Sequence, residues 1–463
     1  MDHRYVEEEL EKASRVDRGA VREIVAKARR AEGLEPSEVA RLLQVEDPDL
    51  LQEIFAAARE IKEKIYGKRI VLFAPLYVSN FCVNNCRYCG YHRENKIPRR
   101  RLTMDEVREE VRVLESMGHK RLALETGEDP KNCPLDYVLE VLETIYSVRF
   151  ERGSIRRVNV NVAATTPEDY RRLKAAKIGT YILFQETYHR PTYEYMHPAG
   201  PKASYEYHLG AMDRALSAGI DDVGIGPLFG LYDYKFEVMA VILHARHLDQ
   251  TFGVGPHTIS MPRLRPATGM SLEDYPHLVS DDDFRKVVAI IRLAVPYTGM
   301  ILSTREKPGF RDEAIGLGIS QISAGSCTGV GAYRQEHEKT AGGAAEEGSP
   351  QFTVEDHRSP DEILQNLCAG GYLPSYCTAC YRKGRTGDRF MPLAKSGQIQ
   401  NVCQPNAILT FKEYLLDYAS PETRRVGEET IRRHLGEIKN PLTRQRTEER
   451  LKQIEEGTRD LYF

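Results

Sequence analysis

Residues 70–95 read IVLFAPLYVSNFCVNNCRYCGYHREN, an apolar run that leads directly into a loop with three cysteines. The apolar run predicts a buried strand over residues 70–77. Further strand-like runs follow, separated by segments with helical periodicity, at residues 121–125, 158–162, 180–185, 222–225, 258–261, 300–303 and 319–324. Eight strands that alternate with helices predict an α/β protein with a (β/α)8 TIM barrel, and a doubly wound open sheet is the alternative.

Three domains are predicted along the chain. Residues 1–66 show helical periodicity, which predicts an N-terminal helical extension. The barrel is predicted over residues 67–340. A loop is predicted at residues 341–350, AGGAAEEGSP, because small and polar residues dominate there. We find no further strand signal after residue 360, so residues 341–463 predict a mostly helical C-terminal domain.

Composition disfavours several classes of partner. The 463 residues include 65 Lys and Arg against 68 Asp and Glu, and a net charge of −3 gives no electrostatic reason to expect nucleic acid or an anionic membrane. No apolar run approaches the roughly 20 residues that a transmembrane helix needs. Residues 1–18, MDHRYVEEELEKASRVDR, are charged throughout, so no signal peptide is visible and we expect a cytoplasmic protein.

Six of the nine cysteines fall into two groups, and the first group is Cys82, Cys86 and Cys89. In a reducing compartment, grouped thiols indicate a metal site rather than a disulfide framework. Three thiolates on one short loop can hold three corners of a 4Fe-4S cluster and leave the fourth iron open. A structural zinc site is the alternative, with His92 as its fourth ligand.

The second group consists of Cys377, Cys380 and Cys403, in the spacing Cys-x2-Cys-x22-Cys. Three thiolates again predict a 4Fe-4S cluster with one open iron, which would make the C-terminal region an iron–sulfur domain. A zinc knuckle is the alternative here, with His434 or Cys368 as the fourth ligand.

The first group resembles a known signature. Its pattern Cys-x3-Cys-x-aromatic-Cys, with Tyr88 as the aromatic residue, resembles that of radical S-adenosylmethionine (SAM) enzymes, in which the cysteine loop also follows the first barrel strand. The resemblance implies that SAM binds the open iron and that its reductive cleavage yields a 5′-deoxyadenosyl radical. It also implies cofactor contacts from Tyr88, Glu125, Glu128, Asn159, Asn161, Gln185, Glu186 and Arg214.

The second group narrows the resemblance to one subfamily. Residues 371–419, which begin GYLPSYCTACYRKGRTGDRF, resemble the C-terminal domain of the tyrosine lyases that mature FeFe-hydrogenase, the HydG type. The resemblance implies that L-tyrosine is cleaved to p-cresol and dehydroglycine, and that dehydroglycine becomes carbon monoxide and cyanide at the second cluster. It also implies an extra fifth iron bound by His257, a reductant such as ferredoxin or flavodoxin, and other hydrogenase maturation proteins as partners.

A tyrosine substrate requires a partner for its carboxylate. A guanidinium group can bind a carboxylate through two parallel hydrogen bonds. Arg305 follows the seventh predicted strand together with Ser303, so this pair is the predicted substrate anchor. Arg263 and Arg265, which follow the sixth strand, compete for the same role.

Two other functions remain open. The first is 2-iminoacetate synthase, the tyrosine lyase of thiamine thiazole biosynthesis, which shares the barrel but lacks the complete second cysteine group. The second is a non-catalytic iron–sulfur or zinc scaffold, which the complete barrel and the open-iron loop disfavour.

Overall fold

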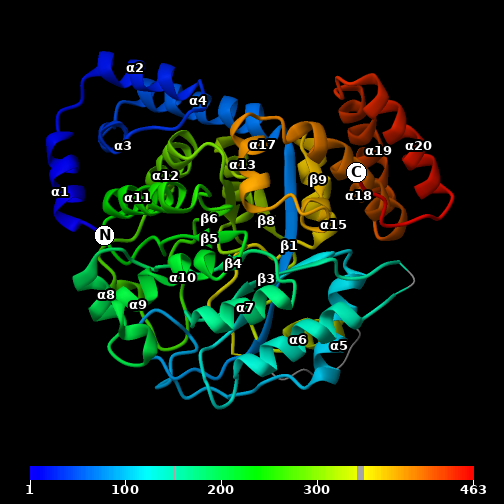
Figure 1. The fold of residues 1–463 in the computed structure, drawn as a ribbon, viewed down its shortest axis with the longest axis horizontal. Coiled ribbons are helices and arrows are strands. Elements are labelled where there is room, and N and C mark those ends of the chain that lie inside the picture. The colour runs from blue at the N-terminus through cyan, green and yellow to red at the C-terminus, as the bar shows by residue number, and fades with distance from the viewer. Residues whose placement is uncertain (151, 341–348) are drawn as a thin grey trace.

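Parallel strands close into a barrel in the computed structural model, which describes residues 1–150, 152–340 and 349–463 (Figure 1). The strands are β1 (Arg69–Ser79), β2 (Arg121–Thr126), β3 (Arg157–Asn161), β4 (Tyr181–Ile182), β5 (Val223–Ile225), β6 (Thr258–Ser260), β7 (Gly299–Leu302) and β8 (Gln321–Ser323). Each pairs in parallel with its neighbours, and β1 pairs with both β2 and β8, which closes the ring. The predicted (β/α)8 barrel is therefore confirmed, and the open sheet is excluded.

Helices surround the barrel and cover the outer faces of its strands. They are α5 (Met104–Ser116), α6 (Leu135–Ser147), α7 (Pro167–Ala175), α8 (Arg190–Met196), α9 (Tyr205–Leu209), α10 (Ala211–Ser217), α11 (Tyr234–Phe252), α12 (Asp281–Ala294), α13 (Pro308–Leu317) and α14 (Ala332–Thr340). Two starts follow from local sequence. Thr103 and Glu106 form a capping box at α5, and Thr166 caps α7, which has a proline in its first turn.

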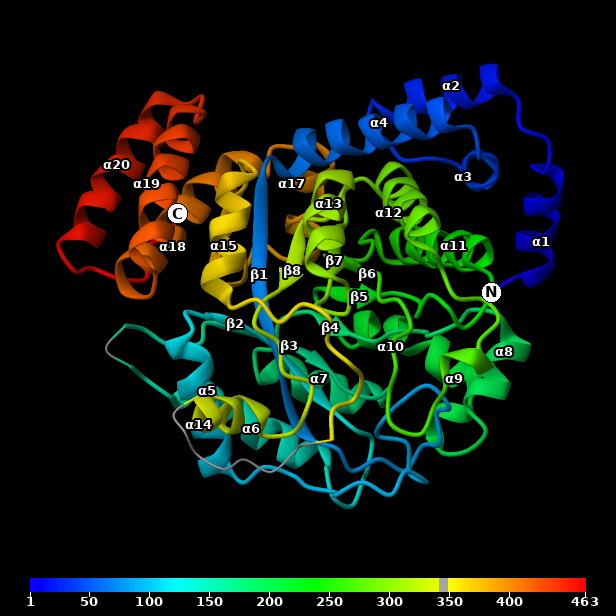
Figure 2. The same cartoon turned by 180° about the vertical axis from the view of Figure 1, so that it is seen from behind.

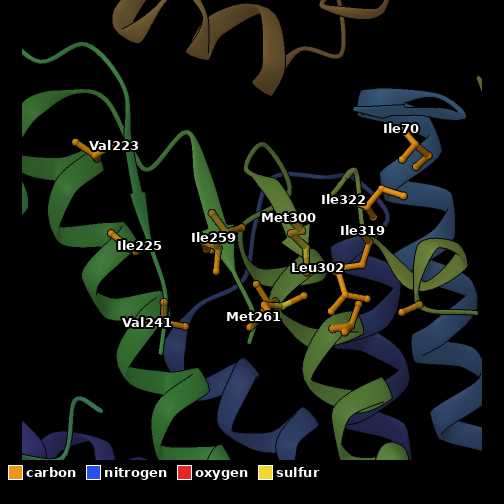
Figure 3. Close-up of a cluster of buried hydrophobic side chains, with 14 of the residues drawn as sticks. Ile70, Val223, Ile225, Val241, Ile259, Met261, Met300, Leu302, Ile319 and Ile322 are labelled. Carbon is orange, nitrogen blue, oxygen red and sulfur yellow. The ribbon is translucent and has the colours of Figure 1, made fainter. Parts of the chain in front are cut away.

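The main core lies between the strands and these helices. Figure 3 shows Ile70, Val223, Ile259, Met300 and Ile322 with Val241 of α11 in this layer, and all of them are buried. Because side chains alternate along a strand, the other face of each strand points into the barrel. Burial of one such aliphatic side chain contributes about 1.5–3 kcal/mol, so this layer holds the barrel walls in place.

The N-terminal residues fold into α1 (His3–Lys12), α2 (Arg18–Ala28), α3 (Pro36–Leu43) and α4 (Pro48–Tyr66). Asp17 and Asp47 cap α2 and α4 by accepting backbone N–H hydrogen bonds, the usual role of aspartate at this position. Helix α4 packs against α12 and α13, and α3 packs against α11 and α12. Figure 2 shows these helices spread over one side of the barrel.

The C-terminal residues contain α15 (Pro360–Ala369), α16 (Ala379–Arg382), α17 (Met391–Lys395), α18 (Gln400–Asp417), α19 (Pro421–Gly436) and α20 (Pro441–Glu455). They also contain a strand, β9 (Leu373–Ser375), so the expectation of no strand after residue 360 was wrong. Strand β9 pairs in parallel with residues 69–71 of β1, where β2 has not yet begun. The predicted loop at 341–350 and the boundary after residue 340 fall largely on residues 341–348, outside the described residues.

No helix in the described part of the chain is long and apolar enough to cross a membrane.

Candidate active site

The first cysteine group lies on the loop that follows β1, at the carboxyl end of the barrel. Neighbouring segments hold this loop through its backbone: the N–H of Val83 donates to the carbonyl of Glu128, and that of Asn85 to Ala199. Arg99 closes the loop from the other side by donating to the carbonyl oxygens of Asn80 and Tyr91, both at 2.7 Å. These backbone and arginine contacts hold the loop without using the cysteine thiols.

A cavity of about 220 Å³ opens beneath this loop, inside the barrel mouth, and all three thiols line it. The predicted site residues that also line it are Tyr88, Glu125, Glu128, Asn161, Glu186, Ser303 and Arg305. They come from β1, β2, β3, β4 and β7 or from the loops that follow these strands. Parallel strands bring their carboxyl ends to one edge, which explains why residues so distant in sequence meet here.

Three predicted cofactor contacts do not line this cavity. Asn159 lies two residues before Asn161 on β3, and its side-chain oxygen accepts the backbone N–H of Thr180. Gln185 is buried and precedes the lining residue Glu186. Arg214 donates to the carbonyl oxygens of Thr165 and Tyr207, which hold its guanidinium away from the cavity lining. These three thus lie outside the cavity lining, and their contact with the cofactor stays a prediction.

The proposed zinc ligand His92 points elsewhere. Its Nδ1 lies 2.9 Å from the carbonyl oxygen of Cys89, and the residue does not line the cavity. Among the described residues, no three His, Cys, Asp or Glu side chains converge as ligands of a single metal ion. Burial raises the pKa of the Cys89 thiol to about 11, so binding of a metal there must displace protons.

The three arginines considered as substrate anchors differ in whether a salt bridge holds them. Arg263 binds Glu306 with two hydrogen bonds, and Arg265 donates to the same carboxylate at 2.6 Å. Arg305 forms no salt bridge with a described carboxylate; instead its guanidinium lies 3.3 Å from the centre of the Phe352 ring. Arg305 is therefore the arginine of this set that remains available to an anion in the cavity.

Glu125 lines the same cavity as Arg305 and can carry the opposite charge. Burial raises the pKa of Glu125 to about 8, although a hydrogen bond from Asn161 and the positive charge of Arg305 favour its ionised form. A carboxyl group in this state ionises readily when a cation binds beside it. Glu125 and Arg305 together can thus hold the two charged groups of an amino acid.

An ion pair that the sequence did not reveal lies beside the cysteines. Lys202 donates to Glu186 at 2.7 Å, and both residues line the cavity. Glu186 adopts a left-handed backbone conformation, with φ of +68°, which costs energy for a residue other than glycine. Strained residues of this kind cluster at functional sites, so the pair is part of the site rather than of the surface.

The second cysteine group lies at the opposite end of the same barrel. Cys377, Cys380 and Cys403 line a smaller cavity, of about 50 Å³, together with His257. Strand β9 places Cys377 beside the start of β1, and α18 carries Cys403. Along β1, Arg69 and Val71 line this cavity whereas Phe73, Pro75 and Tyr77 line the first, so the two cavities take up the two ends of the same strand.

The second cavity is lined by positive charge and by unsatisfied polar atoms. Arg69, Arg121 and Arg385 contribute guanidinium groups, against the single carboxylate of Asp222. Nε of Arg121, Nε of Arg385 and Oδ2 of Asp222 are buried without a hydrogen-bond partner in the described part of the chain. Buried polar atoms of native proteins are normally paired, so the two guanidinium N–H groups indicate a site built for a further hydrogen-bond acceptor, whereas Oδ2 of Asp222 would accept from a donor.

His257 faces this cavity as a neutral imidazole. Burial lowers its pKa, and although Asp222 opposes that shift, Arg121 adds to it. Its Nδ1 lies 3.6 Å from Asp222, and its Nε2 lies 3.3 Å from the hydroxyl of Tyr381. Neutral imidazole is the form that binds a metal.

The two residues proposed as a fourth zinc ligand lie outside the second cavity. His434 contacts Glu437 through Nδ1 at 2.8 Å and the carbonyl oxygen of Gly371 through Nε2 at 3.2 Å. Cys368 is buried, with a hydrogen bond to Thr430. Neither residue is therefore placed to complete a zinc site with this trio, and the histidine that shares its cavity is His257.

Two family models match the chain. The radical SAM superfamily matches residues 76–243, and the Biotin and Thiamin Synthesis associated domain matches residues 260–373. Among curated proteins, the 2-iminoacetate synthase of Salmonella typhimurium is 32% identical over 355 residues, which cover 76% of this chain and 89% of that protein.

Solved structures extend the similarity to the whole chain. HydG, described as a maturase of the FeFe-hydrogenase, is 62% identical with a TM-score of 0.96, over 100% of this chain and 99% of that one. The HydG of Carboxydothermus hydrogenoformans is 41% identical with a TM-score of 0.81, over 97% and 98% of the two chains.

Proposed function

The chain belongs to the radical SAM superfamily, in the group that includes 2-iminoacetate synthase and HydG, and on that premise we propose that it is a HydG-type tyrosine lyase. It cleaves L-tyrosine to p-cresol and dehydroglycine at the carboxyl end of the barrel. It then converts dehydroglycine to carbon monoxide and cyanide at the opposite end, for assembly of the FeFe-hydrogenase active site.

The residues of the first site fit its cofactors. Cys82, Cys86 and Cys89 supply three thiolates, and the described residues include no group of metal ligands that would close the site, so the trio is the donor set of a 4Fe-4S cluster with an open iron. Bound there with SAM, this cluster supplies a 5′-deoxyadenosyl radical. Tyr88, Glu128 and the remaining lining residues shape the space for SAM and exclude water from it.

The tyrosine substrate is held by charge at both ends of its amino-acid moiety. Arg305 receives the carboxylate, with Ser303 beside it, because Arg263 and Arg265 are held by Glu306. Glu125, which the resemblance gave as a cofactor contact, instead receives the amino group of tyrosine and ionises as it does so. Phe352, stacked on Arg305, fixes the guanidinium plane.

The second cysteine trio is the observation that favours a HydG-type tyrosine lyase over a 2-iminoacetate synthase. Cys377, Cys380 and Cys403 supply a second 4Fe-4S cluster, and His257 is positioned for an additional iron. The arginines around them favour an anionic fragment such as dehydroglycine over a neutral one. A 2-iminoacetate synthase would need no such site, since its product leaves for thiamine thiazole synthesis.

The cellular setting follows from this chemistry. A low-potential cluster needs a one-electron donor, for which ferredoxin or flavodoxin is suitable. The iron-bound products need other hydrogenase maturation proteins as acceptors. A cytoplasmic location suits a cluster enzyme, because thiols are kept reduced there.

Anaerobic reconstitution with SAM, dithionite and L-tyrosine tests the proposal. Wild-type protein should release p-cresol, and Cys86→Ala should release none. The paired variant Cys377→Ala with Cys380→Ala should keep p-cresol release but lose carbon monoxide. Cys368→Ala, a buried cysteine near the second site but outside its cavity, is the matched control and should keep both products. Wild-type protein that loads both clusters yet yields no p-cresol would exclude the tyrosine lyase.

A further inference from the structure

A strap of residues 349–356 crosses the first cysteine loop from the C-terminal side of the chain. The N–H of Gly90 donates to the carbonyl oxygen of Gln351 at 3.1 Å, and the N–H of Gln351 donates to Thr328 at 3.0 Å. A Cβ on Gly90 would lie 2.8 Å from the carbonyl oxygens of both Pro350 and Gln351, so only glycine permits this approach. The strap and the loop are therefore built in contact.

The side chain of Gln351 bridges β1 and a cluster ligand. The hydroxyl of Tyr77 lies 2.9 Å from Oε1 and donates to it. Nε2 of the same amide lies 3.8 Å from Sγ of Cys89. A cluster-bound thiolate only accepts hydrogen bonds, so the amide turns its N–H groups to the sulfur while its oxygen accepts from Tyr77.

A second N–H donor, from the same loop, lies near Sγ of Cys89. A more distant side-chain donor lies near Sγ of Cys82. The backbone N–H of Tyr91 lies 3.4 Å from Sγ of Cys89. Nδ2 of Asn84 lies 3.8 Å from Sγ of Cys82, but it also donates to Glu128 at 2.5 Å. Of these donors, Gln351 alone comes from outside the loop and the barrel strands, 262 residues away from the sulfur that it meets.

We propose that Gln351 is a positioning residue that raises the reduction potential of the first cluster by donating an N–H hydrogen bond to Cys89, with Tyr77 fixing its orientation. Reduction adds negative charge to the cluster and its sulfur ligands, and a donor aimed at a sulfur stabilises that added charge. The inference rests on the proposed cluster at Cys82, Cys86 and Cys89.

The test is the midpoint potential of the first cluster, measured by redox titration with electron paramagnetic resonance. The full chain is reconstituted without SAM or tyrosine, in the Cys377→Ala, Cys380→Ala background, so that only the first cluster contributes. Gln351→Leu should shift the potential to a more negative value, so that the reduced-to-oxidised ratio at a fixed potential falls several-fold. A tenfold fall corresponds to about 59 mV for one electron.

Tyr77→Phe tests whether the hydrogen bond from Gln351 to Cys89, and not the packing of Gln351, sets the reduction potential. It should shift the potential in the same direction but less than Gln351→Leu, because the amide remains but loses its fixed orientation. In the double variant, Tyr77→Phe should add nothing to Gln351→Leu. An additive effect would contradict the proposed chain of hydrogen bonds.

Thr353→Val is the matched control, because Thr353 anchors the same strap to the carbonyl oxygen of Pro266 and contacts no cysteine. It should leave the potential unchanged. Gln351→Asn, which keeps the amide but shortens it by one methylene, should also lower the potential and serves if the leucine variant loses its cluster. An unchanged potential in a fully loaded Gln351 variant, or an equal shift in Thr353→Val, would overturn the inference. Absence of the cluster in the parent protein would instead count against the proposed function.

Discussion

Replacement of Arg305 by alanine is the most quantitative test of the substrate site. Its guanidinium lines the first cavity and forms no salt bridge with a described carboxylate, so a bound carboxylate would be its charged partner. Two charge-assisted hydrogen bonds are worth about 1.5–3 kcal/mol each. Water that enters the vacated space recovers part of this, so we expect a loss of about 3–4 kcal/mol and a kcat/KM for tyrosine roughly 150- to 1,000-fold lower.

The assay is p-cresol release against tyrosine concentration, with saturating SAM and dithionite. Arg305→Lys keeps the charge but loses the paired geometry, so about a tenfold loss is expected. Arg108→Ala, which removes an exposed arginine on α5, should stay within about twofold of the wild type. SAM cleavage without tyrosine should persist in Arg305→Ala. If kcat/KM in Arg305→Ala stays within threefold of the wild type, the assignment of the anchor is refuted.

Other predictions concern charge and packing around the cavities. Burial in the folded protein raises the pKa of Glu125 to about 8, so ionisation of this carboxyl group opposes folding. The free energy of unfolding of the cluster-free wild type, measured relative to Glu125→Gln, should therefore fall by up to about 5 kcal/mol between about pH 4.5 and pH 8 and then level off. A difference in denaturant midpoint between the two proteins that does not change with pH would contradict this. Gly90→Ala should lower stability by about 1–3 kcal/mol, since its Cβ meets the backbone at Gln351, and a wild-type melting temperature would show that the contact is not tight. Asp356→Ala leaves the buried Arg311 without its carboxylate partner and should lower the free energy of unfolding by about 3–5 kcal/mol in the same assay. A decrease below about 1 kcal/mol would mean that the guanidinium finds another partner.

The barrel could be predicted because each of its strands is a short apolar run followed by a recognisable helix or loop. Strand β9 could not, since Leu373–Ser375 is three residues long and contains a proline, a composition that alone does not indicate a strand. It forms because the start of β1 extends beyond β2 and leaves backbone groups free for pairing. That pairing is a tertiary effect, and it decides at which end of the barrel the second cysteine group lies.

The two cysteine groups could be located from their spacing in the sequence, whereas the residues that surround them in the fold could not. The choice among Arg263, Arg265 and Arg305 depends on which of them Glu306 binds, and three arginines near strand ends look alike in sequence. Gln351 reaches Cys89 only because the strap folds back over the loop, and its neighbours in sequence give no sign of that contact.

Carbon monoxide formed alongside p-cresol tests the central claim, two reaction sites in one barrel, most directly. Both products are measured in the same anaerobic reaction of fully reconstituted wild-type protein with tyrosine, and carbon monoxide is trapped by haemoglobin. A HydG-type enzyme should produce carbon monoxide together with p-cresol, and the paired Cys377→Ala, Cys380→Ala variant should produce p-cresol alone. If wild-type protein with both clusters loaded releases p-cresol and no carbon monoxide, the second site does not perform the proposed reaction and the 2-iminoacetate synthase function is the correct one.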